Sequence, residues 1–276
     1  MRYYDAMEFY KNSDLPKKIY KDGTCIRVMS SNVLFSASTE GIWAERATML
    51  SCVYLNYRPD FLGLQECDPN MMAVISDLIK DKYEIVRYTR PKEGINRHNY
   101  TPIFYYKGRW EQVDGGWFLF ERGCWTMTWA VLQSKENPEV RCLHANLHQT
   151  PWGGEELMNC SIAINGELKR LREKHPNVPI YVGGDYNCER TWEAFPVLID
   201  GVEIETAGLL AETSDSLGRH THKVGQPLNE VETKGSIDHI CVDGKLVNVK
   251  LYRAVFDDIL LWATDHAPIF IDTILK

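Results

Sequence analysis

Acidic, amide and histidine side chains stand at the ends of several apolar segments of this sequence. These segments carry the β-branched and aromatic residues that are typical of buried strands. The polar residues that follow or interrupt them are Asn32, Glu66, Asp185, Asn187, Asp238, Asp265 and His266. Unpaired carboxylates are unfavourable beside a hydrophobic core. Several carboxylates at one edge of a sheet therefore need a shared counter-charge, and a divalent cation would supply it.

Each of these residues, taken alone, also has a purely structural interpretation. An Asn or a Glu at a strand end is commonly a turn or cap residue, and Asp185 with Asn187 could form an Asx turn. His148 could be a strand histidine whose hydrogen bonds are satisfied within the fold. The joint occurrence of so many polar strand ends favours chemistry instead. Strand alternation adds to it, because His144, Asn146 and His148 share one face of a strand.

A set of short apolar segments must form the strands that hold these residues. They span residues 25–34, 61–64, 84–88, 102–106, 128–133, 140–148, 179–183, 236–242, 246–255 and 268–274. Helical spacing of apolar residues predicts helices over 43–57, 70–80 and 157–171, and a fourth over 191–199. Strands outnumber helices and come in successive blocks. This order indicates two sheets packed face to face with helices outside, rather than one alternating parallel sheet.

The net charge of the chain bears on which kinds of partner the protein could bind. The sequence has 276 residues, with 31 Lys and Arg against 38 Asp and Glu, so its net charge is −7 with histidine neutral. This balance argues against a broad basic surface that grips nucleic acid, but not against an enzyme that meets phosphate through bound cations. No apolar run of about 18 residues is present, so we expect no membrane span.

The spread of the polar residues predicts the domain organisation. Because residues from Asn32 to His266 must meet in space, we expect one domain over 25–276 and an N-terminal extension over 1–24. The first twenty residues hold no apolar signal segment, and none of the eight cysteines forms a CxxC pair. We therefore expect a reduced, cytoplasmic protein and a monomer, with secretion left open if a signal segment has been removed.

Six short motifs closely resemble those of the endonuclease/exonuclease/phosphatase superfamily, the deoxyribonuclease I-like metal-dependent phosphoesterases. They occur in that family's order from about Cys25 to the C-terminus, and the flanking residues are most similar to bacterial members without an assigned substrate. The motifs are Ser31-Asn32, Leu64-Gln65-Glu66, Asn146-Leu147-His148, Gly184-Asp185-Tyr186-Asn187, Ser236-Ile237-Asp238-His239 and Thr264-Asp265-His266-Ala267-Pro268. The resemblance implies an α+β fold, a four-layer α/β/β/α sandwich of two mostly antiparallel sheets with outer helices.

The resemblance also implies a metal site. Glu66 would be the principal ligand, with Asn32 and Asp265 close to the same ion. Hard oxygen ligands suit Mg²⁺ or Mn²⁺. The implied chemistry is in-line attack of water on phosphorus, in which a cation and fixed hydrogen-bond donors stabilise the charge that grows on oxygen.

The remaining motif residues take catalytic roles by the same resemblance. Asp185 would orient or deprotonate the attacking water, and Asn187 would hold that water or a phosphate oxygen. His266 would contact the scissile phosphate, and Asp238 would pair with His266 and favour its charged form. His148 would act as a second polar clamp on the other side of the phosphate.

Four further residues are candidates for substrate binding. Asn99 stands where many relatives have an acidic residue, and there it could hydrogen-bond His148 without offsetting its charge. Tyr105 ends a strand that is similar to a family strand, and Trp152 could stack on a base or ring or simply belong to a turn. His222 follows Thr221 at a place where some relatives carry a similar Thr-x-His pattern, although a zinc pair with His220 is an alternative.

Three functions are compatible with these residues. We favour a divalent-metal-dependent hydrolase of a small or lipid-derived phosphomonoester or phosphodiester. The first alternative is a Mg²⁺-dependent nuclease, which the acidic net charge disfavours because nucleic-acid binding normally draws on a stripe of Lys and Arg. The second is a non-catalytic binding domain of the same fold. That reading would need the loss of a motif residue, and none is missing.

Overall fold

The protein is described here by a computed structural model. It describes residues 25–39, 41–87, 100–120, 126–214, 221–222 and 235–276. The predicted extension over 1–24 and the candidate residue Asn99 lie outside these ranges. None of the described helices is long and apolar enough to cross a membrane.

Seven strands form the first sheet, in the order β10-β12-β13-β1-β2-β4-β3. β1 lies at its centre, parallel to β2 and antiparallel to β13. The strands are β1 (Ile26–Asn32), β2 (Phe61–Gln65), β3 (Tyr83–Ile85), β4 (Ile103–Tyr106), β10 (Thr213–Ser214), β12 (Val247–Ala254) and β13 (Ile269–Leu275).

Six strands form the second sheet, in the order β5-β6-β7-β8-β11-β9. Here β7 and β8 are parallel, and the remaining neighbours are antiparallel. The strands are β5 (Trp110–Leu119), β6 (Thr126–Ser134), β7 (Arg141–His148), β8 (Ile180–Asp185), β9 (Glu205–Thr206) and β11 (Asp238–Val242). Both sheets are therefore mostly antiparallel.

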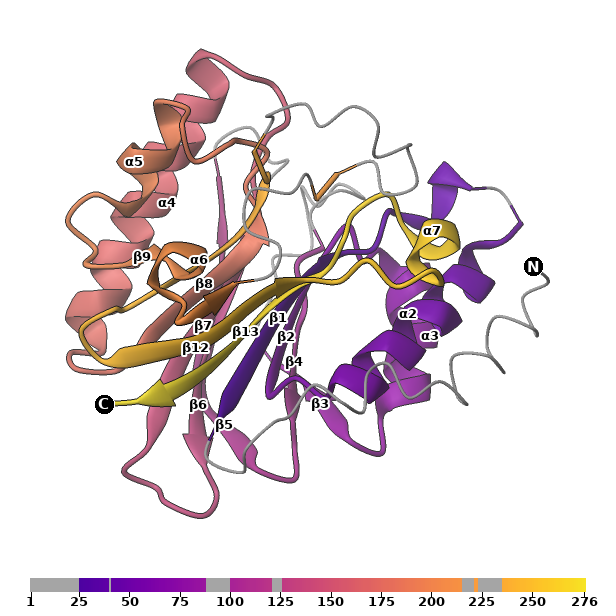
Figure 1. Cartoon of the computed structure of the whole chain (residues 1–276), viewed down its shortest axis with the longest axis horizontal. Coiled ribbons are helices and arrows are strands. Elements are labelled where there is room, and N and C mark those ends of the chain that lie inside the picture. The colour runs from indigo at the N-terminus through magenta and orange to yellow at the C-terminus, as the bar shows by residue number, and fades with distance from the viewer. Residues whose placement is uncertain (1–24, 40, 88–99, 121–125, 215–220, 223–234) are drawn as a thin grey trace.

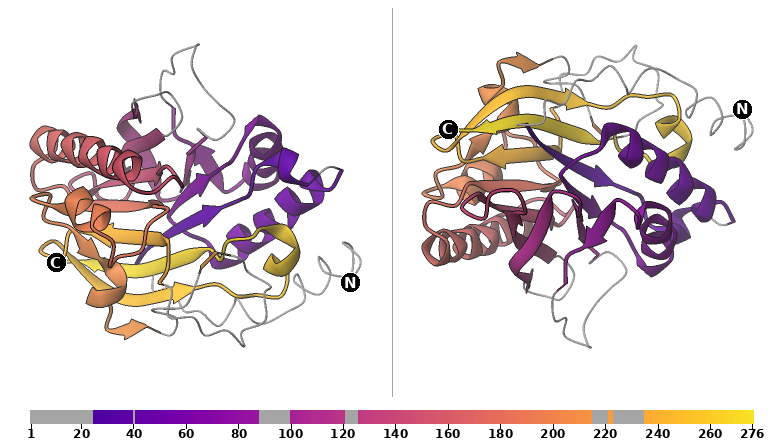
Figure 2. Two further views of the ribbon diagram at one scale, coloured as in Figure 1. Left: turned by 90° about the horizontal axis from the view of Figure 1, so that it is seen from above. Right: turned by 90° about the horizontal axis from the view of Figure 1, so that it is seen from below.

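Helices cover the outer face of each sheet, so the molecule has four layers (Figure 1). The views from above and below show the same order (Figure 2). The helices beside the seven-stranded sheet are α2 (Trp43–Tyr57), α3 (Pro69–Ile79) and α7 (Leu260–Ala263), with the short 3-10 helix η2 (Ser36–Ser38). Those beside the six-stranded sheet are α4 (Glu155–Lys174) and α5 (Ala194–Ile199), while α6 (Ala207–Leu210) lies against β11 and β12. The predicted α/β/β/α sandwich is confirmed.

Three hydrophobic cores separate the four layers. One lies between the seven-stranded sheet and α2 with α3, and one between the six-stranded sheet and α4 with α5. The third lies between the sheets, where Phe61 of β2 packs against Trp110 of β5 and Tyr181 of β8. β1 and β8 are buried along their whole length, because each is covered on both faces.

The two sheets approach each other closely beside the polar strand ends. A Cβ atom on Gly63 would stand 2.7 Å from Cγ of Asn146 on the opposite sheet. The Asn146 amide donates to the carbonyls of Leu64 and Pro102, at 2.7 and 3.1 Å, and its oxygen accepts from Gln65. These hydrogen bonds fasten β7 to the end of β2, which carries the Glu66 motif.

Candidate active site

Three titratable residues form a row across the six-stranded sheet. His148 at the end of β7 pairs in register with Asp185 at the end of β8, and Asp185 pairs with Asp238 at the start of β11. All three side chains are buried. Residues that pair in register point to the same face of a sheet. We call this row, together with Asn187, the six-strand half of the site.

Four residues of the seven-stranded sheet face this row. Asn32 ends β1, Glu66 follows β2, and Asp265 with His266 precedes β13. Glu66 has a left-handed backbone conformation, with φ of 56°. Such conformations cost free energy and cluster at functional sites. The Phe35 amide donates to Glu66 Oε2 at 3.2 Å, which fixes that carboxylate. We call Asn32, Glu66, Asp265 and His266 the seven-strand half of the site.

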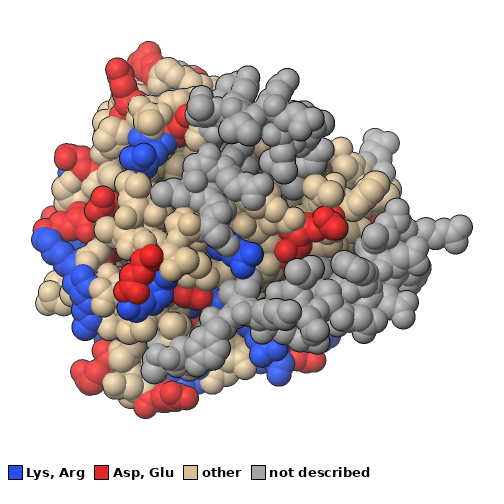
Figure 3. Space-filling view, viewed as in Figure 1, with Lys and Arg blue, Asp and Glu red and all other residues tan. Residues whose placement is uncertain are grey.

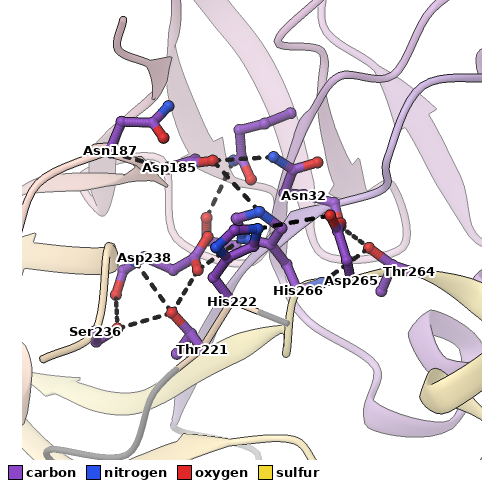
Figure 4. A network of polar contacts seen from close by, with 12 residues as sticks. Asn32, Asp185, Asn187, Thr221, His222, Ser236, Asp238, Thr264, Asp265 and His266 are labelled. Carbon is purple, nitrogen blue, oxygen red and sulfur yellow. Dashed lines mark hydrogen bonds and ion pairs between the residues drawn. The ribbon is translucent and has the colours of Figure 1, made fainter. Parts of the chain in front are cut away.

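Asn32 joins the two halves (Figure 4). Its Nδ2 atom donates to Glu66 Oε1 at 3.1 Å and to Asp185 Oδ2 at 3.0 Å. The Nε2 atom of His148 lies 3.7 Å from Asp185 Oδ2 and 3.9 Å from Glu66 Oε1. Asn32, Glu66, His148 and Asp185, which the sequence distributes over four strands, therefore converge on one point.

His266 provides the second connection between the halves. Its Nδ1 atom lies 3.0 Å from Asp238 Oδ2, and its Nε2 atom lies 3.8 Å from Asp185 Oδ2. Burial alone would lower the pKa of His266, but the carboxylates of Asp238 and Asp185 outweigh burial and raise it to about 10. Burial would raise the pKa of Asp238, but the charge of His266 keeps it below its usual value. The pair is thus an imidazolium and a carboxylate at neutral pH.

Asp185 and Asn187 form the Asx turn that was one reading of their spacing. The Asn187 N–H donates to Asp185 Oδ1 at 2.9 Å, and the Asn187 backbone is left-handed, with φ of 46°. The Asn187 side chain donates to the Gln149 carbonyl at 2.8 Å. Burial raises the pKa of Asp185 despite the opposing charge of His266. The turn therefore fixes one carboxylate oxygen and leaves the other on Asn32, facing His148 and His266.

The residues of the site fit a divalent cation. The Oδ1 atom of Asp265 is buried and has no hydrogen-bond partner among the described residues. Asp185, Asp238 and His266 each offer a ligand atom within 4.8 Å of the others. In the described part of the chain, no Lys or Arg forms an ion pair with Glu66, Asp185, Asp238 or Asp265. A cation held mainly by carboxylate oxygens would balance these charges.

His222 also lies at the site. It forms an isolated β-bridge with His266, and the two imidazole rings lie 4.7 Å apart. Its Nε2 atom is 3.7 Å from Asp265 Oδ2, and His222, Asp265 and His266 form a second group that could hold a metal ion. The alternative zinc partner, His220, lies outside the described residues.

Tyr105 corrects the sequence interpretation. It pairs with Phe61 at the start of β2, so it lies at the opposite end of that strand from Glu66. It packs in the core between the sheets, and its hydroxyl hydrogen-bonds Glu84. The placement of Tyr105 at the site was wrong, because its motif fixed the strand but not the end of the strand at which the side chain stands.

Trp152, His144 and His239 lie outside the converging cluster. Trp152 is 60% exposed in the loop that follows β7, and its stacking role stays a prediction. His144 is fully buried and stacks on Phe61 between the sheets. His239, which alternates with Asp238 along β11, packs on Tyr186 and Phe195.

One polar residue at the site, Thr221, was not among the candidates. Its hydroxyl lies 2.5 Å from Asp238 Oδ2, and the side chain is fully buried. Thr221 stands directly before His222, so the signal was the similarity of Thr221-His222 to the Thr-x-His pattern of some relatives.

Solved structures with this architecture span almost the whole chain. An endonuclease/exonuclease/phosphatase family protein from Bacteroides thetaiotaomicron is 19% identical, with a TM-score of 0.74 over 91% of this chain and 95% of that one. A mannosyl-6-phosphatase of the same organism is 20% identical, with a TM-score of 0.76 over 90% and 99%. D. rerio TDP2 complexed with a single-strand DNA product is 16% identical, with a TM-score of 0.69 over 91% and 99%.

The chain has the endonuclease/exonuclease/phosphatase fold. The two mixed sheets and their flanking helices are those of the deoxyribonuclease I-like architecture. Its sequence matches no protein-family model and no curated protein. In this fold, strand ends from both sheets bring the two halves of the site together (Figure 4).

Proposed function

We propose that the protein is a divalent-metal-dependent phosphoester hydrolase. The observation that carries this proposal is the meeting of Glu66 and Asp185 on one Asn32 amide. This contact puts a carboxylate of the predicted metal site beside the carboxylate predicted to serve the attacking water. The hypothesis of a non-catalytic domain would leave unexplained why the buried Asp185, Asp238 and His266 lie beside the partly exposed carboxylates of Glu66 and Asp265.

Asn32, Glu66 and Asp265 would hold the cation, which we expect to be Mg²⁺ or Mn²⁺. When bound, it would act as a Lewis acid on the phosphoryl oxygen and lower the charge of the cluster. The orphaned Oδ1 atom of Asp265 supports this role, because a buried carboxylate oxygen without a donor is otherwise unfavourable.

Asp185 would accept the proton of the attacking water. Burial raises the pKa of this carboxyl, which makes it a better proton acceptor than a solvated aspartate. Its Oδ1 atom accepts from the Asn187 N–H, whereas its Oδ2 atom accepts from Asn32 and faces His148 and His266. Oδ2 would therefore take the proton. The water oxygen would attack phosphorus, and the bond to the leaving oxygen would break on the opposite side.

His266 and His148 would bind the phosphate. His266 is held as a cation by Asp238, so its Nε2–H can donate to a non-bridging oxygen without moving a proton first. His148 stands on the other side of Asp185 and presents Nε2 to the same space. Fixed donors that face the developing charge supply the stabilisation of the transition state.

We favour a small phosphoester as the substrate. The net charge is −7. Among the described residues on the face shown in Figure 3, Lys and Arg are interspersed with Asp and Glu and form no stripe. A long polyanion binds through many basic contacts. The second candidate is a nuclease, which the similar structure with a single-strand DNA product favours.

A substrate panel tests both candidates. Bis-p-nitrophenyl phosphate, a sugar 6-phosphate and a single-stranded DNA oligonucleotide are each incubated with wild-type protein and with Glu66→Gln, with Mg²⁺ or with EDTA. We expect hydrolysis of a small ester that requires Mg²⁺ and is lost in the variant. Cleavage of DNA alone would promote the nuclease, and hydrolysis unaffected by EDTA would overturn the metal mechanism.

A further inference from the structure

The two halves of the site belong to different sheets, so their relative position must be fixed by contacts across the sandwich. His266 and Asp238 make one such contact. Residues 221–222 make another, because the Ala267 N–H donates to the Thr221 carbonyl at 2.7 Å and His222 bridges His266. The same short segment reaches β11 through the Thr221 hydroxyl (Figure 4).

The hydroxyl of Thr221 has a defined donor role. An ionised carboxylate only accepts hydrogen bonds. The single proton of Thr221 must therefore go to Asp238 Oδ2 at 2.5 Å. As an acceptor, the same oxygen lies 3.3 Å from the Asp238 N–H. The Thr221 hydroxyl thus hydrogen-bonds both the carboxylate and the backbone N–H of Asp238. Ser236 donates to the Asp238 carbonyl at 2.6 Å.

Asp238 Oδ2 is shared between Thr221 and His266. It accepts from the Thr221 hydroxyl at 2.5 Å and from His266 Nδ1 at 3.0 Å. Two donors on one oxygen fix the rotation of the carboxylate, and this rotation fixes the direction of the imidazole. Without the hydroxyl, the Asp238 carboxylate could rotate away from His266, and the imidazole Nε2 would no longer point toward Asp185.

We infer that Thr221 is a positioning residue. Its hydroxyl orients the Asp238 carboxylate toward His266 and so fixes the relative position of the two halves of the site. This inference rests on the proposed function for its kinetic consequences but not for its structural ones. Thr221 would touch neither the substrate nor the metal. It would act through Asp238, whose orientation sets the orientation of the His266 imidazole.

Two variants separate the hydroxyl from the shape of the side chain. Thr221→Val keeps the shape and removes the donor, and Thr221→Ser keeps the donor. We expect Thr221→Val to lower kcat about 10- to 100-fold with little change in KM, since supporting residues of such sites commonly have effects of this size. We expect Thr221→Ser to restore most of kcat. Mn²⁺ affinity, measured by electron paramagnetic resonance, should change less than threefold.

A matched control removes a similar hydroxyl elsewhere. Thr273 is also fully buried, and its hydroxyl lies 3.1 Å from the Tyr181 hydroxyl across the sandwich, near the start of β1. Thr273→Val removes a hydroxyl that also donates to the Ile26 carbonyl at 3.0 Å. It should lower the urea midpoint of unfolding about as much as Thr221→Val, because each variant removes a buried hydroxyl with more than one partner, and it should leave kcat unchanged. An equal loss of kcat in both variants would show a general packing effect and overturn the inference.

A spectroscopic measurement tests the inference without any substrate. In protein labelled with ¹⁵N-histidine, the Nδ1 proton of His266 is identified by its absence in His266→Asn. Its chemical shift should change in Thr221→Val and return in Thr221→Ser. An unchanged shift in Thr221→Val would overturn the positioning role even if the protein hydrolyses phosphoesters. The expected change in an inactive wild-type protein would support Thr221 and refute the proposed function instead.

Discussion

The Nδ1 atom of His266 lies 3.0 Å from the Asp238 carboxylate, although the two residues belong to different sheets. This contact leaves Nε2 directed at Asp185, 3.8 Å away. The imidazole is thus oriented by one carboxylate and presented toward another. Such an arrangement keeps a positive donor ready beside a group that is predicted to take a proton.

Replacement of Asp238 by asparagine should disable His266 without removing bulk. Asn cannot balance the imidazolium, and one partner of a buried ion pair is then left uncompensated. We expect kcat for the best substrate of the panel to fall at least about tenfold, with the far-UV circular dichroism unchanged. Asp200→Asn, an exposed carboxylate near α5, is the control and should behave as wild type. Full activity of Asp238→Asn would contradict the role of the pair.

Glu66→Gln should weaken metal binding directly. The amide removes one negative charge from the predicted ligand set but keeps the size of the side chain. We expect Mn²⁺ affinity, measured by isothermal titration calorimetry, to fall at least about tenfold, because ligand charge dominates the binding of hard cations. Glu205→Gln, on the exposed side of β9, should bind Mn²⁺ like the wild type. Equal affinities in all three proteins would place the metal elsewhere.

Buried histidines outside the site should make the fold sensitive to acid. Burial lowers the pKa of His144 to about 3 and of His239 to about 4, from the ordinary value of 6.5. The unfolded chain therefore takes up protons below about pH 6.5 that the folded chain refuses, and stability falls as the pH drops toward 4. At pH 5 each histidine should cost about 2 kcal/mol relative to pH 7.

The variant His144→Phe tests this linkage. Urea unfolding at pH 7 and pH 5 should show a smaller difference between the two pH values than in wild type, by about 2 kcal/mol. The comparison of pH values within each protein removes any general effect of the substitution on packing. An identical pH dependence in both proteins would show that His144 is protonated in the folded state.

Gly184 should tolerate no side chain. A Cβ atom there would overlap the Leu147 carbonyl oxygen and lie 2.9 Å from Leu147 Cγ. We expect Gly184→Ala to destabilise the protein by about 1–3 kcal/mol and to reduce activity, because Asp185 follows directly. Gly166 in α4 is the matched control, since nothing lies within 4 Å of its Cβ position. Gly166→Ala should stabilise by about 0.5–1 kcal/mol, and a similar response at both positions would refute the steric argument.

Strand ends made much of the site predictable from the sequence. Polar residues after long apolar runs are rare enough to be noticed, so Asn32, Glu66, Asp185 and Asp238 could be named and their convergence expected. The strand β5 was not predicted, because Gly115 and Gly116 and the irregularity between Gln112 and Asp114 break the alternation of apolar residues. In such edge strands, the alternation of apolar and polar residues is weak.

Other features depend on contacts that no local pattern encodes. Thr221 lies outside any regular strand and is joined to the site only by tertiary hydrogen bonds. Tyr105 shows the converse error, since a correctly predicted strand placed its side chain at the wrong end of the sheet. Which end of a strand faces the site follows from register, and register is set by the packing of the whole sandwich.

Because the site is divided between two sheets, the rate of hydrolysis should depend on how the two sheets are aligned. Adjacent residues along a strand are about 3.3 Å apart, which is comparable to the 3.0 Å contact between His266 and Asp238. A slip of one sheet over the other by a single residue would therefore separate the imidazole from its carboxylate while most of the apolar interface stayed buried. The close approach of Gly63 and Asn146 opposes such a slip. Hydrolysis would then be lost before the protein unfolds.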